Sequence, residues 1–349
     1  MHPAADGLFY ALENQFAPVL AGKNLRIGFM RAELHPKLPA TLARHRLYCS
    51  QSFKPDHDKL QAAGFEVIPI LKTKAALDVV VYLSTRNREE NKYMMARGIS
   101  MLKEGGVFIT AQHNTLGAKH LEKDLKALLP DVQIVSKKHC RVMQVVKTAA
   151  PDDMQHELYM AYGNPEQVGK TNMQARPGLF SWKKPDTGSQ MLVDVIEQVD
   201  LAGKGADFGA GWGFLSQRAL KMSTRIREMH LYEAEKRALD MCASNLKAIL
   251  KKAKAEVYSH WSDIPAEDFI PAFDFILCNP PQHSVSKTDY GLTIRFIEQC
   301  AAALKPGGVL WLVTNHHIPA TRILEGLFTD VEDKNHDKQY KVFRAVKPE

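Results

Sequence analysis

Gly205-Ala-Asp-Phe-Gly-Ala-Gly-Trp-Gly213 decides the fold of this 349-residue chain. A short stretch with strand character leads into a loop that has glycine at every second position, and a helical stretch, Phe214–Met222, follows. Glycine lets the backbone approach a ligand closely and adopt positive φ angles, and the N-terminus of the following helix favours a negatively charged group. We therefore expect a cofactor site in this loop, formed by Asp207, Gly209, Gly211 and Gly213.

The spacing of these glycines narrows the class of cofactor. Dinucleotide-binding dehydrogenases have the pattern GxGxxG. Here the third glycine comes one residue earlier and gives GxGxG, the spacing typical of methyltransferases. A tight turn between a strand and a helix that binds nothing is the alternative interpretation.

Glu233 and Asp263 are the next candidates for cofactor binding. Glu233 ends the predicted strand Glu228–Tyr232, about 20 residues beyond the loop, where an acidic side chain can accept hydrogen bonds from both ribose hydroxyls. The alternative is a carboxylate that interacts with the N-terminus of the next helix. Asp263 follows the predicted strand Glu256–Ser259 and can accept a hydrogen bond from an adenine amino group, or merely cap a helix.

The apolar strand Phe273–Cys278 ends in Asn279-Pro280-Pro281. Ligands bind at the carboxyl ends of strands in such sheets, and two prolines make this segment rigid. An exocyclic amine on a base or an amide is a poor nucleophile because its lone pair is delocalised. The side-chain oxygen of Asn279 and the carbonyl of Pro280 can accept its two N–H groups and direct the lone pair at a sulfonium methyl group. We expect Asn279, Pro280 and Pro281 to be catalytic, with Asn279 also beside the cofactor.

The C-terminal half alternates strands with helices, which predicts a parallel doubly wound sheet. Besides the segments already named, we expect helices over Ala234–Lys252 and Thr293–Leu304, a turn at Lys305–Gly308, and strands over Val309–Thr314 and Tyr340–Val346.

The N-terminal half contains a weaker copy of this pattern. Asp78-Val-Val-Val-Tyr-Leu parallels Asp274-Phe-Ile-Leu-Cys, and Leu102-Lys-Glu-Gly-Gly parallels Leu304-Lys-Pro-Gly-Gly. Its first strand, Asn24–Met30, lacks a glycine loop, and Ser84-Thr-Arg86 replaces Asn-Pro-Pro. We therefore expect an α/β protein with two tandem Rossmann-like doubly wound domains. Residues 1–150 form the degenerate domain, 151–175 a polar linker and 176–349 the catalytic domain.

Length and composition exclude several other classes of protein. The length suggests two domains, and no apolar stretch is long enough to cross a membrane. The N-terminus, Met1-His-Pro-Ala-Ala-Asp6, has no basic region followed by an apolar core, so no secretory signal is visible and we expect a cytoplasmic protein. The five cysteines are widely spaced and never form a CxxC pair, which argues against disulfides and structural zinc. Neither His283 nor His316-His317 has a carboxylate or cysteine at ligand spacing, so we expect no metal, and we expect a monomer.

The formal net charge of +7 is compatible with a polyanionic partner, because lysine and arginine displace counterions from phosphate. Basic clusters in the N-terminal half make Arg86, Arg88, Lys137 and Lys138 our candidates for RNA binding. Each cluster can also be a merely solvated surface.

The C-terminal half resembles class I methyltransferases with an Asn-Pro-Pro motif. The whole chain resembles the bacterial two-domain rRNA guanine-N2 methyltransferases, the small-subunit type most closely. Beyond the glycine loop and Asn279-Pro-Pro-Gln-His283, the matching segments are Arg176-Pro-Gly-Leu-Phe-Ser-Trp, Asp186-Thr-Gly-Ser-Gln190, Asn315 and Tyr340-Lys-Val-Phe-Arg-Ala345. The resemblance implies S-adenosylmethionine as cofactor, 16S rRNA as substrate, and a silent N-terminal domain that helps to bind RNA and to stabilise the protein.

The resemblance also implies roles for single residues. Phe180 and Gly188 lie in the segment that covers the cofactor, and Gln282, His283 and Asn315 lie on the substrate side. The family usually has an aromatic residue after Asn-Pro-Pro, and Gln282 has no aromatic face on which a base can stack. Phe180, Tyr290 or His283 can take over this stacking, or the target differs from that of the family.

Two other functions stay open at this point. The first is methylation of another planar amine, adenine N6 or a protein glutamine. The second is a non-catalytic RNA-binding factor in ribosome assembly, which Gln282 alone favours, while the intact glycine loop, Glu233 and Asn279 argue for an enzyme.

Overall fold

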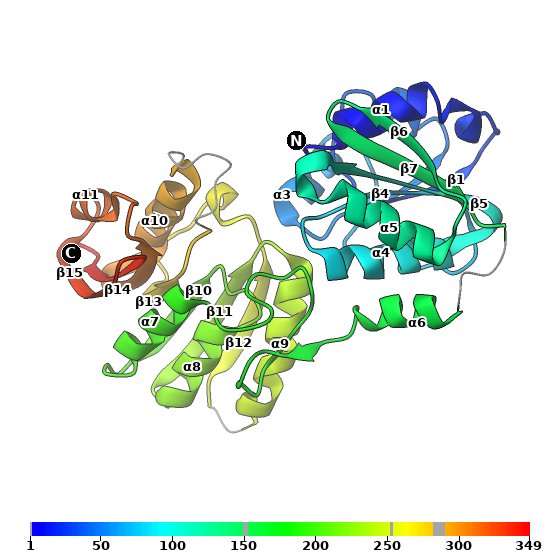
Figure 1. The fold of residues 1–349 in the computed structure, drawn as a ribbon. Helices are drawn as coiled ribbons and strands as arrows, with labels where there is room; N and C mark the ends of the chain where they lie inside the picture. The colour runs from blue at the N-terminus through cyan, green and yellow to red at the C-terminus, as the bar shows by residue number, and fades with distance from the viewer. Residues whose placement is uncertain (1, 149–152, 252–253, 282–289) are drawn as a thin grey trace. The chain divides into compact units, whose positions relative to one another are not determined.

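The computed structural model describes residues 2–148, 153–251, 254–281 and 290–349. The chain forms two compact units, Met1–Pro165 with Arg176–Gly178 and Glu166–Ala175 with Leu179–Glu349. Each unit contains a seven-stranded sheet (Figure 1). The segment 151–175, for which the sequence predicts a linker, contains helix α6 (Asp153–Ala161) and a small hairpin of β8 (Glu166–Gln167) and β9 (Gln174–Ala175).

The first unit is built from seven strands and the helices between them. Its strands are β1 (Arg26–Met30), β2 (Arg46–Ser50), β3 (Val67–Ile68), β4 (Leu77–Leu83), β5 (Leu102–His113), β6 (Gln133–Lys137) and β7 (Cys140–Val146). Its α-helices are α1 (Ala5–Glu13), α2 (Leu38–Thr41), α3 (Lys54–Ala62), α4 (Arg88–Met101), α5 (Ala118–Leu128) and α6, with short 3₁₀ helices at Ala17–Leu20 and Asn114–Leu116.

The second unit repeats this plan. Its large sheet contains β10 (Gly203–Phe208), β11 (Ile226–Glu233), β12 (Glu256–Trp261), β13 (Phe273–Cys278), β14 (Leu304–Asn315), β15 (Thr329–His336) and β16 (Tyr340–Val346). Its α-helices are α7 (Thr187–Ile196), α8 (Phe214–Met222), α9 (Lys236–Leu250), α10 (Gly291–Ala303) and α11 (Ala320–Glu325), with a 3₁₀ helix at Ile264–Ala266.

The two sheets have the same strand order. It is β3-β2-β1-β4-β5-β7-β6 in the first unit and β12-β11-β10-β13-β14-β16-β15 in the second, so every strand has a counterpart at the same position. This confirms the predicted α/β fold with two tandem Rossmann-like domains.

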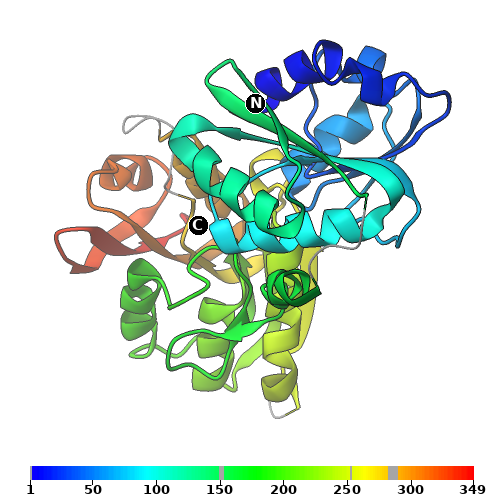
Figure 2. The same cartoon turned by 45° about the vertical axis from the view of Figure 1, so that its right-hand side comes forward.

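Helices cover both faces of the second sheet. In Figure 1, and in Figure 2 after a turn of 45°, α7, α8 and α9 (green to yellow-green) lie on one face and α10 and α11 (orange) on the other. Each face of the sheet has its own hydrophobic core. Along β13, Phe275 and Leu277 pack into the core beneath α7, α8 and α9, while Ile276 and Cys278 pack into the core beneath α10 and α11. A strand that is buried on both faces consists mostly of apolar residues, and the continuous apolar run Phe275–Cys278 therefore predicted β13 from the sequence.

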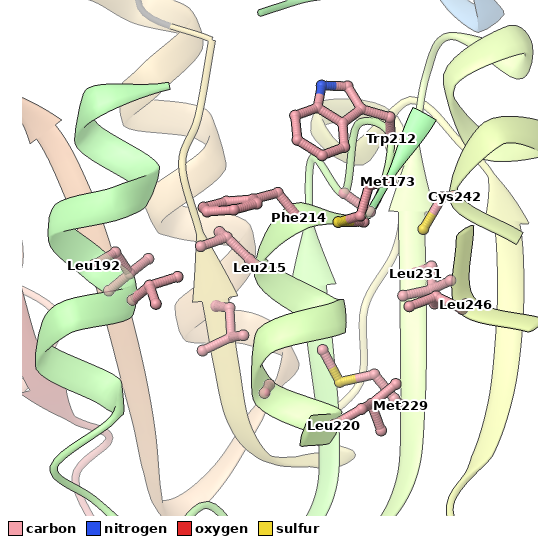
Figure 3. Packing of buried hydrophobic residues seen from close by; sticks show 14 of the residues in the cluster. Met173, Leu192, Trp212, Phe214, Leu215, Leu220, Met229, Leu231, Cys242 and Leu246 are labelled. Atoms are coloured by element: carbon pink, nitrogen blue, oxygen red, sulfur yellow. The ribbon is translucent and has the colours of Figure 1, made fainter. Parts of the chain in front are cut away.

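Figure 3 shows the core beneath α7, α8 and α9. Leu192 comes from α7, Phe214 and Leu215 from α8, and Leu231 from β11, and all four are buried. Leu246 reaches the same core from α9. This packing fixes α7 and α8 against the sheet and therefore positions the loops that precede them.

The sheets are mixed, not purely parallel as predicted. In each unit the strand at the sixth position, β7 or β16, pairs antiparallel with both neighbours. The connections that enter these strands have only a few residues, and such short connections cannot make a parallel crossover. The β6–β7 turn is Lys138-His139 with φ angles of 52° and 57°, a geometry that two-residue hairpins require and that usually selects asparagine and glycine.

The predicted turn at Lys305–Gly308 also differs from the structure. These residues belong to the first part of β14, and Gly307 has a φ of 72°. The register between β13 and β14 shifts in this region. A local irregularity within the strand therefore takes the place of the expected turn.

An aspartate at the start of the fourth strand ties three strands together in each unit. In the first unit Asp78 accepts a hydrogen bond from the backbone N–H of Arg26 at 2.7 Å and forms an ion pair with Lys103 at 2.5 Å. In the second unit Asp274 receives the N–H of Lys204 and the ammonium group of Lys305, both at 2.7 Å. Burial opposes ionisation, but the hydrogen bonds and the nearby positive charges outweigh it and hold the pKa of both carboxyl groups below the usual range.

We expect Asp78→Asn to lower the free energy of unfolding by about 1.5–3 kcal/mol at pH 7, the range for hydrogen bonds to a charged group. Asp274→Asn should cost about 1 kcal/mol, because 34% of that side chain is exposed and solvent screens its charge. A lowered pKa gives stability that is present above the unfolded-state pKa of about 4 and is lost as the pH falls through the folded-state value. Urea unfolding at pH 7 and pH 3 should therefore show a smaller loss at pH 3 than at pH 7.

Asp131→Asn is the matched control, because this carboxylate is exposed. It should change the free energy of unfolding by less than about 0.5 kcal/mol at either pH. Equal losses at pH 3 and pH 7 for Asp78→Asn would show that the shape of this side chain matters and its charge does not.

Candidate active site

The candidate site lies where β10, β11 and β13 end, at the carboxyl edge of the second sheet. The glycine loop follows β10, Glu233 is the last residue of β11, and Asn279 follows β13 directly. A pocket opens here, and the space in it, part of which is continuous with the solvent, is about 420 Å³. It is lined by Phe180, Ser181, Asp186, Ser189, Gly209, Ala210, Gly211, Trp212, Phe214, Leu215 and Asn279.

The three glycines of the loop all have positive φ angles, but they meet different surroundings. At Gly209, with a φ of 87°, an added Cβ would lie 3.6 Å from the carbonyl oxygen of Asn279. At Gly213, with a φ of 94°, it would lie 2.6 Å from the Sγ of Cys242, so packing alone excludes a side chain. At Gly211, with a φ of 55°, no atom lies within 4 Å of that position, so this backbone is open to a ligand.

Asp207 lies in β10 behind the loop and is completely buried. Its Oδ2 accepts hydrogen bonds from the Ser216 hydroxyl at 2.5 Å and the Ser216 N–H at 3.1 Å. Burial raises the pKa of this carboxyl group to about 7, because the two bonds from Ser216 offset only part of the desolvation. Asp207 therefore holds the first turn of α8 against the strand and does not line the pocket.

Glu233 braces the loop from the end of β11. Its Oε2 accepts the backbone N–H of Gly211 at 2.8 Å, and its Oε1 accepts the N–H of Glu235 at the same distance. Burial raises the pKa of Glu233, and the hydrogen bonds from the backbone oppose this rise. Asp263 lies nearby at the start of the 3₁₀ helix Ile264–Ala266, one residue after Ser262, whose N–H bonds to the carbonyl of Glu233.

The side chain of Asn279 is anchored by the first turn of α7. Its Nδ2 donates to Oδ2 of Asp186 at 3.0 Å and to Oγ of Ser189 at 2.8 Å. The hydroxyl of Thr293 in α10 donates to the carbonyl of Pro281 at 3.2 Å, which holds the end of the motif. Gln282 and His283 lie outside the residues that the structure describes.

Phe180 lines the pocket, and the residue that follows it, Ser181, has a strained backbone conformation. The side chain of Phe180 is 56% exposed, its carbonyl accepts the indole N–H of Trp212 at 3.0 Å, and the next residue, Ser181, has a φ of 49°. Non-glycine residues held in this conformation cluster at functional sites. Phe180, which the resemblance to the family places over the cofactor, lines the pocket, and Ser181 and Trp212 line it without having been predicted from the sequence.

Gly188 and Asn315 lie just outside the pocket lining. A Cβ at Gly188 would lie 2.9 Å from the ring of Tyr340 and 3.2 Å from Oδ2 of Asp186. Gly188 therefore lets α7 approach β16 while the flanking residues Asp186 and Ser189 face the pocket. Asn315 ends β14 and pairs with Tyr340.

In the first unit, the ends of β1 and β4 correspond to the strand ends that form the pocket of the second unit. Hydrogen bonds within the protein occupy polar groups of the residues that follow these two strands. The Oδ1 of Asn91 accepts the backbone N–H of Thr85 at 2.8 Å, and its Nδ2 donates to the carbonyl of Thr85 at 2.9 Å. The ring of His2 lies 2.7 Å from the carbonyl of Ser84, and the N–H of His2 bonds to the carboxylate of Glu33, which follows β1. The N-terminal segment thus joins the ends of β1 and β4, where the second unit has its glycine loop and Asn279.

The basic residues singled out in the first unit gather at one edge of its sheet. Arg86 follows the end of β4 and is exposed. Lys137 and Lys138 are exposed at the tip of the β6–β7 hairpin, which the bond from Asn114 N–H to the carbonyl of His139 joins to the end of β5. Arg88 differs, because its guanidinium group binds both oxygens of the buried Asp124 at 2.7 and 2.8 Å.

Metal-binding clusters and membrane-spanning helices are both absent from the described part of the chain. Within the described residues, no three histidine, cysteine, aspartate or glutamate side chains are grouped so as to hold a metal ion. Over the same ranges, no helix is long and apolar enough to cross a membrane.

Taken together, the strand order, the GxGxG loop and Asn279 at the adjacent strand end define a protein of the methyltransferase class. The methyltransferase small-domain model matches residues 170–344, and the chain belongs to this family.

Known relatives extend the likeness beyond this domain. The chain is 26% identical over 275 residues to ribosomal RNA small subunit methyltransferase C of Vibrio cholerae, and the alignment covers 77% of each protein. It is also 26% identical over 266 residues to the Haemophilus influenzae protein of the same name, covering 76% of this chain and 78% of the relative.

A solved structure shares the fold of both units. It is that of a T. thermophilus 16S rRNA N2 methyltransferase in complex with AdoMet and guanosine. Its TM-score is 0.79 at 21% identity, and the match covers 99% of this chain and 94% of that one.

We expect Gly213→Ala to destabilise the second unit by about 2–5 kcal/mol. The positive φ costs a residue with a Cβ about 1–2 kcal/mol, and the overlap with Cys242 adds about 1–3 kcal/mol. Gly211→Ala should cost only the positive-φ penalty of about 1–2 kcal/mol, because no atom lies close to the added Cβ. Urea unfolding measures both, and Cys242→Ala should restore part of the loss in Gly213→Ala but none in Gly211→Ala.

Proposed function

We propose that this protein transfers the methyl group of S-adenosylmethionine to the exocyclic N2 amine of a guanine in 16S rRNA. The observation that carries the proposal is the presence of Asn279 and the open backbone of Gly211 in the lining of one pocket. Family membership, the names of the two relatives and the guanosine bound to the structural neighbour support it.

The residues of the pocket fit an adenosyl cofactor. The backbone at Gly211 leaves room for a ligand, and the carboxylate of Glu233 lies directly behind it. We propose that Glu233 accepts the ribose hydroxyl groups, that Asp263 lies on the adenine side, and that Phe180 covers the ligand. S-Adenosylmethionine supplies a methyl group on a positively charged sulfur, and such a charge is favoured near carboxylates.

The amine of guanine must be oriented before it can react. Its lone pair is delocalised into the base, so the two N–H groups have to be held in a geometry that makes the lone pair available. We propose that Oδ1 of Asn279 and the carbonyl of Pro280 accept these N–H groups, while Pro281 keeps the segment rigid. A strong general base would not be needed, because the positive charge would move from sulfur to the amine nitrogen as the methyl group is transferred. The N–H groups of that cationic nitrogen are acidic enough to lose a proton to water.

We further propose that the first unit binds RNA through the edge that carries Arg86, Lys137 and Lys138. This unit would bind no cofactor, since His2 and Asn91 already satisfy the corresponding strand ends. The protein would act as a monomer without a metal ion, in the cytoplasm where ribosomal subunits are assembled.

Asn279→Ala tests the catalytic proposal. It removes the acceptor but keeps both prolines, so cofactor affinity should persist while kcat falls by ~10²–10³, as for the loss of one preorganised polar contact in the transition state. Asn279→Asp should be at least as damaging, because it places a second carboxylate against Asp186. The measurement is transfer of labelled methyl groups to unmodified small ribosomal subunits, followed by nucleoside analysis.

The nucleoside product decides between substrates. N2-methylguanine is the expected result, whereas N6-methyladenine would change the target base and labelled protein would change the class of substrate. Absence of transfer together with absence of cofactor binding would favour a non-catalytic assembly factor.

Charge reversal tests the proposed RNA edge. Replacing Arg86, Lys137 and Lys138 with glutamate should weaken RNA binding and flatten its dependence on salt, by about one unit of slope for each phosphate that is no longer neutralised. Arg88 is not replaced, because reversing its charge would leave the buried carboxylate of Asp124 without the guanidinium group that it binds.

The matched control reverses three charges at the opposite edge of the same sheet. Lys23 precedes β1, Lys72 and Lys74 precede β4, and all three side chains are exposed. If this control weakens RNA binding as much as the first variant, net charge alone explains the effect and the edge is not a binding surface.

A further inference from the structure

The carboxamide of Asn279 has two nearly isosteric ends, and only one of them can act on an amine. The oxygen accepts N–H groups, whereas a flipped carboxamide would present its own donors to the donors of the substrate. The backbone of Asn279-Pro280-Pro281 does not determine this orientation. Some other part of the protein therefore has to select it.

The first turn of α7 contains two acceptors that make this selection. Asp186 is the N-cap of α7, and its Oδ2 receives both the N–H of Ser189 at 2.9 Å and the Nδ2 of Asn279 at 3.0 Å. Because a carboxylate only accepts hydrogen bonds, the NH₂ end of Asn279 has to face Asp186. Ser189, which is 8% exposed, provides the second acceptor at 2.8 Å.

The same contacts strengthen the oxygen as an acceptor. The amide is planar, so directing Nδ2 at α7 directs Oδ1 to the opposite side of the group. A hydrogen bond from the NH₂ group to a carboxylate also shifts electron density toward the amide oxygen, as polarised chains of hydrogen bonds do. The approach of α7 depends on Gly188, where a Cβ would collide with Tyr340 of β16 at 2.9 Å.

We infer that Asp186 and Ser189 are positioning residues, which fix the carboxamide of Asn279 with its nitrogen toward α7 and its oxygen on the opposite side, where we place the methyl-accepting amine. This inference rests on the proposed function, because it assigns the role of Asn279 in amine methylation. Asp186 and Ser189 act through Asn279 and hold the acceptor in place before substrate arrives.

A spectroscopic experiment tests the contact without any substrate. In protein labelled with ¹⁵N on asparagine, the side-chain NH₂ signal of Asn279 is identified by its loss in Asn279→Ala. Asp186→Asn keeps a residue that caps helices well, and it should shift this signal and accelerate its hydrogen exchange. Asp194→Asn, an exposed carboxylate on the same helix, is the matched control and should leave the signal unchanged. An unchanged signal in Asp186→Asn and in Ser189→Ala would overturn the inference.

A kinetic experiment tests the consequence. We expect Asp186→Asn to lower kcat by ~10–100-fold, as supporting residues around a site do, while the affinity for S-adenosylmethionine changes by less than about threefold. In an Asn279→Ala background the same substitution should have no further effect on kcat, because the residue it positions is gone. Additive losses would show that Asp186 acts independently of Asn279, and a loss of cofactor affinity that accounts for the lower activity would show that Asp186 contacts the cofactor. Either result would overturn the positioning role.

The two experiments separate this inference from the proposed function. If wild-type protein transfers no methyl group to small-subunit RNA while the NH₂ signal responds to Asp186→Asn, the substrate assignment fails and the orientation of Asn279 stands. If wild-type protein methylates guanine while the signal does not respond, the proposed function stands and the positioning role fails.

Discussion

The register between β10 and β13 is the constraint on which the candidate site depends. Asp207 pairs with Leu277 and Phe208 with Cys278, so the chain leaves the two strands side by side at Gly209 and Asn279. A slip of one residue would place Pro280 beside the glycine loop and turn every side chain of β13 to the other face. The apolar residues of β13, which pack into different cores on the two faces, prevent this slip. The hydrophobic core thus determines the position of two polar groups that do not belong to it.

The first unit shows that the register alone does not make a site. Met30 of β1 pairs with Tyr82 of β4 at the end of the ladder, as Phe208 pairs with Cys278. The next residue, Arg31, keeps a positive φ of 52° where the second unit has Gly209 at 87°. The backbone therefore has a positive φ at this position in both units, but the first unit has an arginine where the second has a glycine. The same scaffold can support a site or dispense with one, because function depends on the residues at the strand ends.

The sequence predicted the features that are local or periodic. Strands buried on both faces appear as continuous apolar runs, and the glycine loop and Asn279-Pro280-Pro281 lie beside such runs. Three features depend on information that the sequence does not express locally. The antiparallel strands follow short connections, one of them a Lys138-His139 turn without the usual asparagine or glycine. Asp186 reaches Asn279 across 93 positions of the chain, and Trp212 reaches Phe180 across 32, so only the tertiary structure brings them together.

Both units use an asparagine carboxamide to join a strand-end loop to a helix, but in opposite directions. In the first unit Asn91 belongs to α4, and both ends of its carboxamide are spent on the backbone of Thr85. In the second unit the asparagine belongs to the loop itself, and its NH₂ group donates to Asp186 and Ser189 at the start of α7. A carboxamide that binds the loop with both ends can only stabilise it, whereas one that is held by its nitrogen keeps the oxygen end directed away from the helix. The asparagine of the helix, Asn91, therefore makes a structural contact, whereas the asparagine of the loop, Asn279, is an oriented side chain in the lining of the pocket.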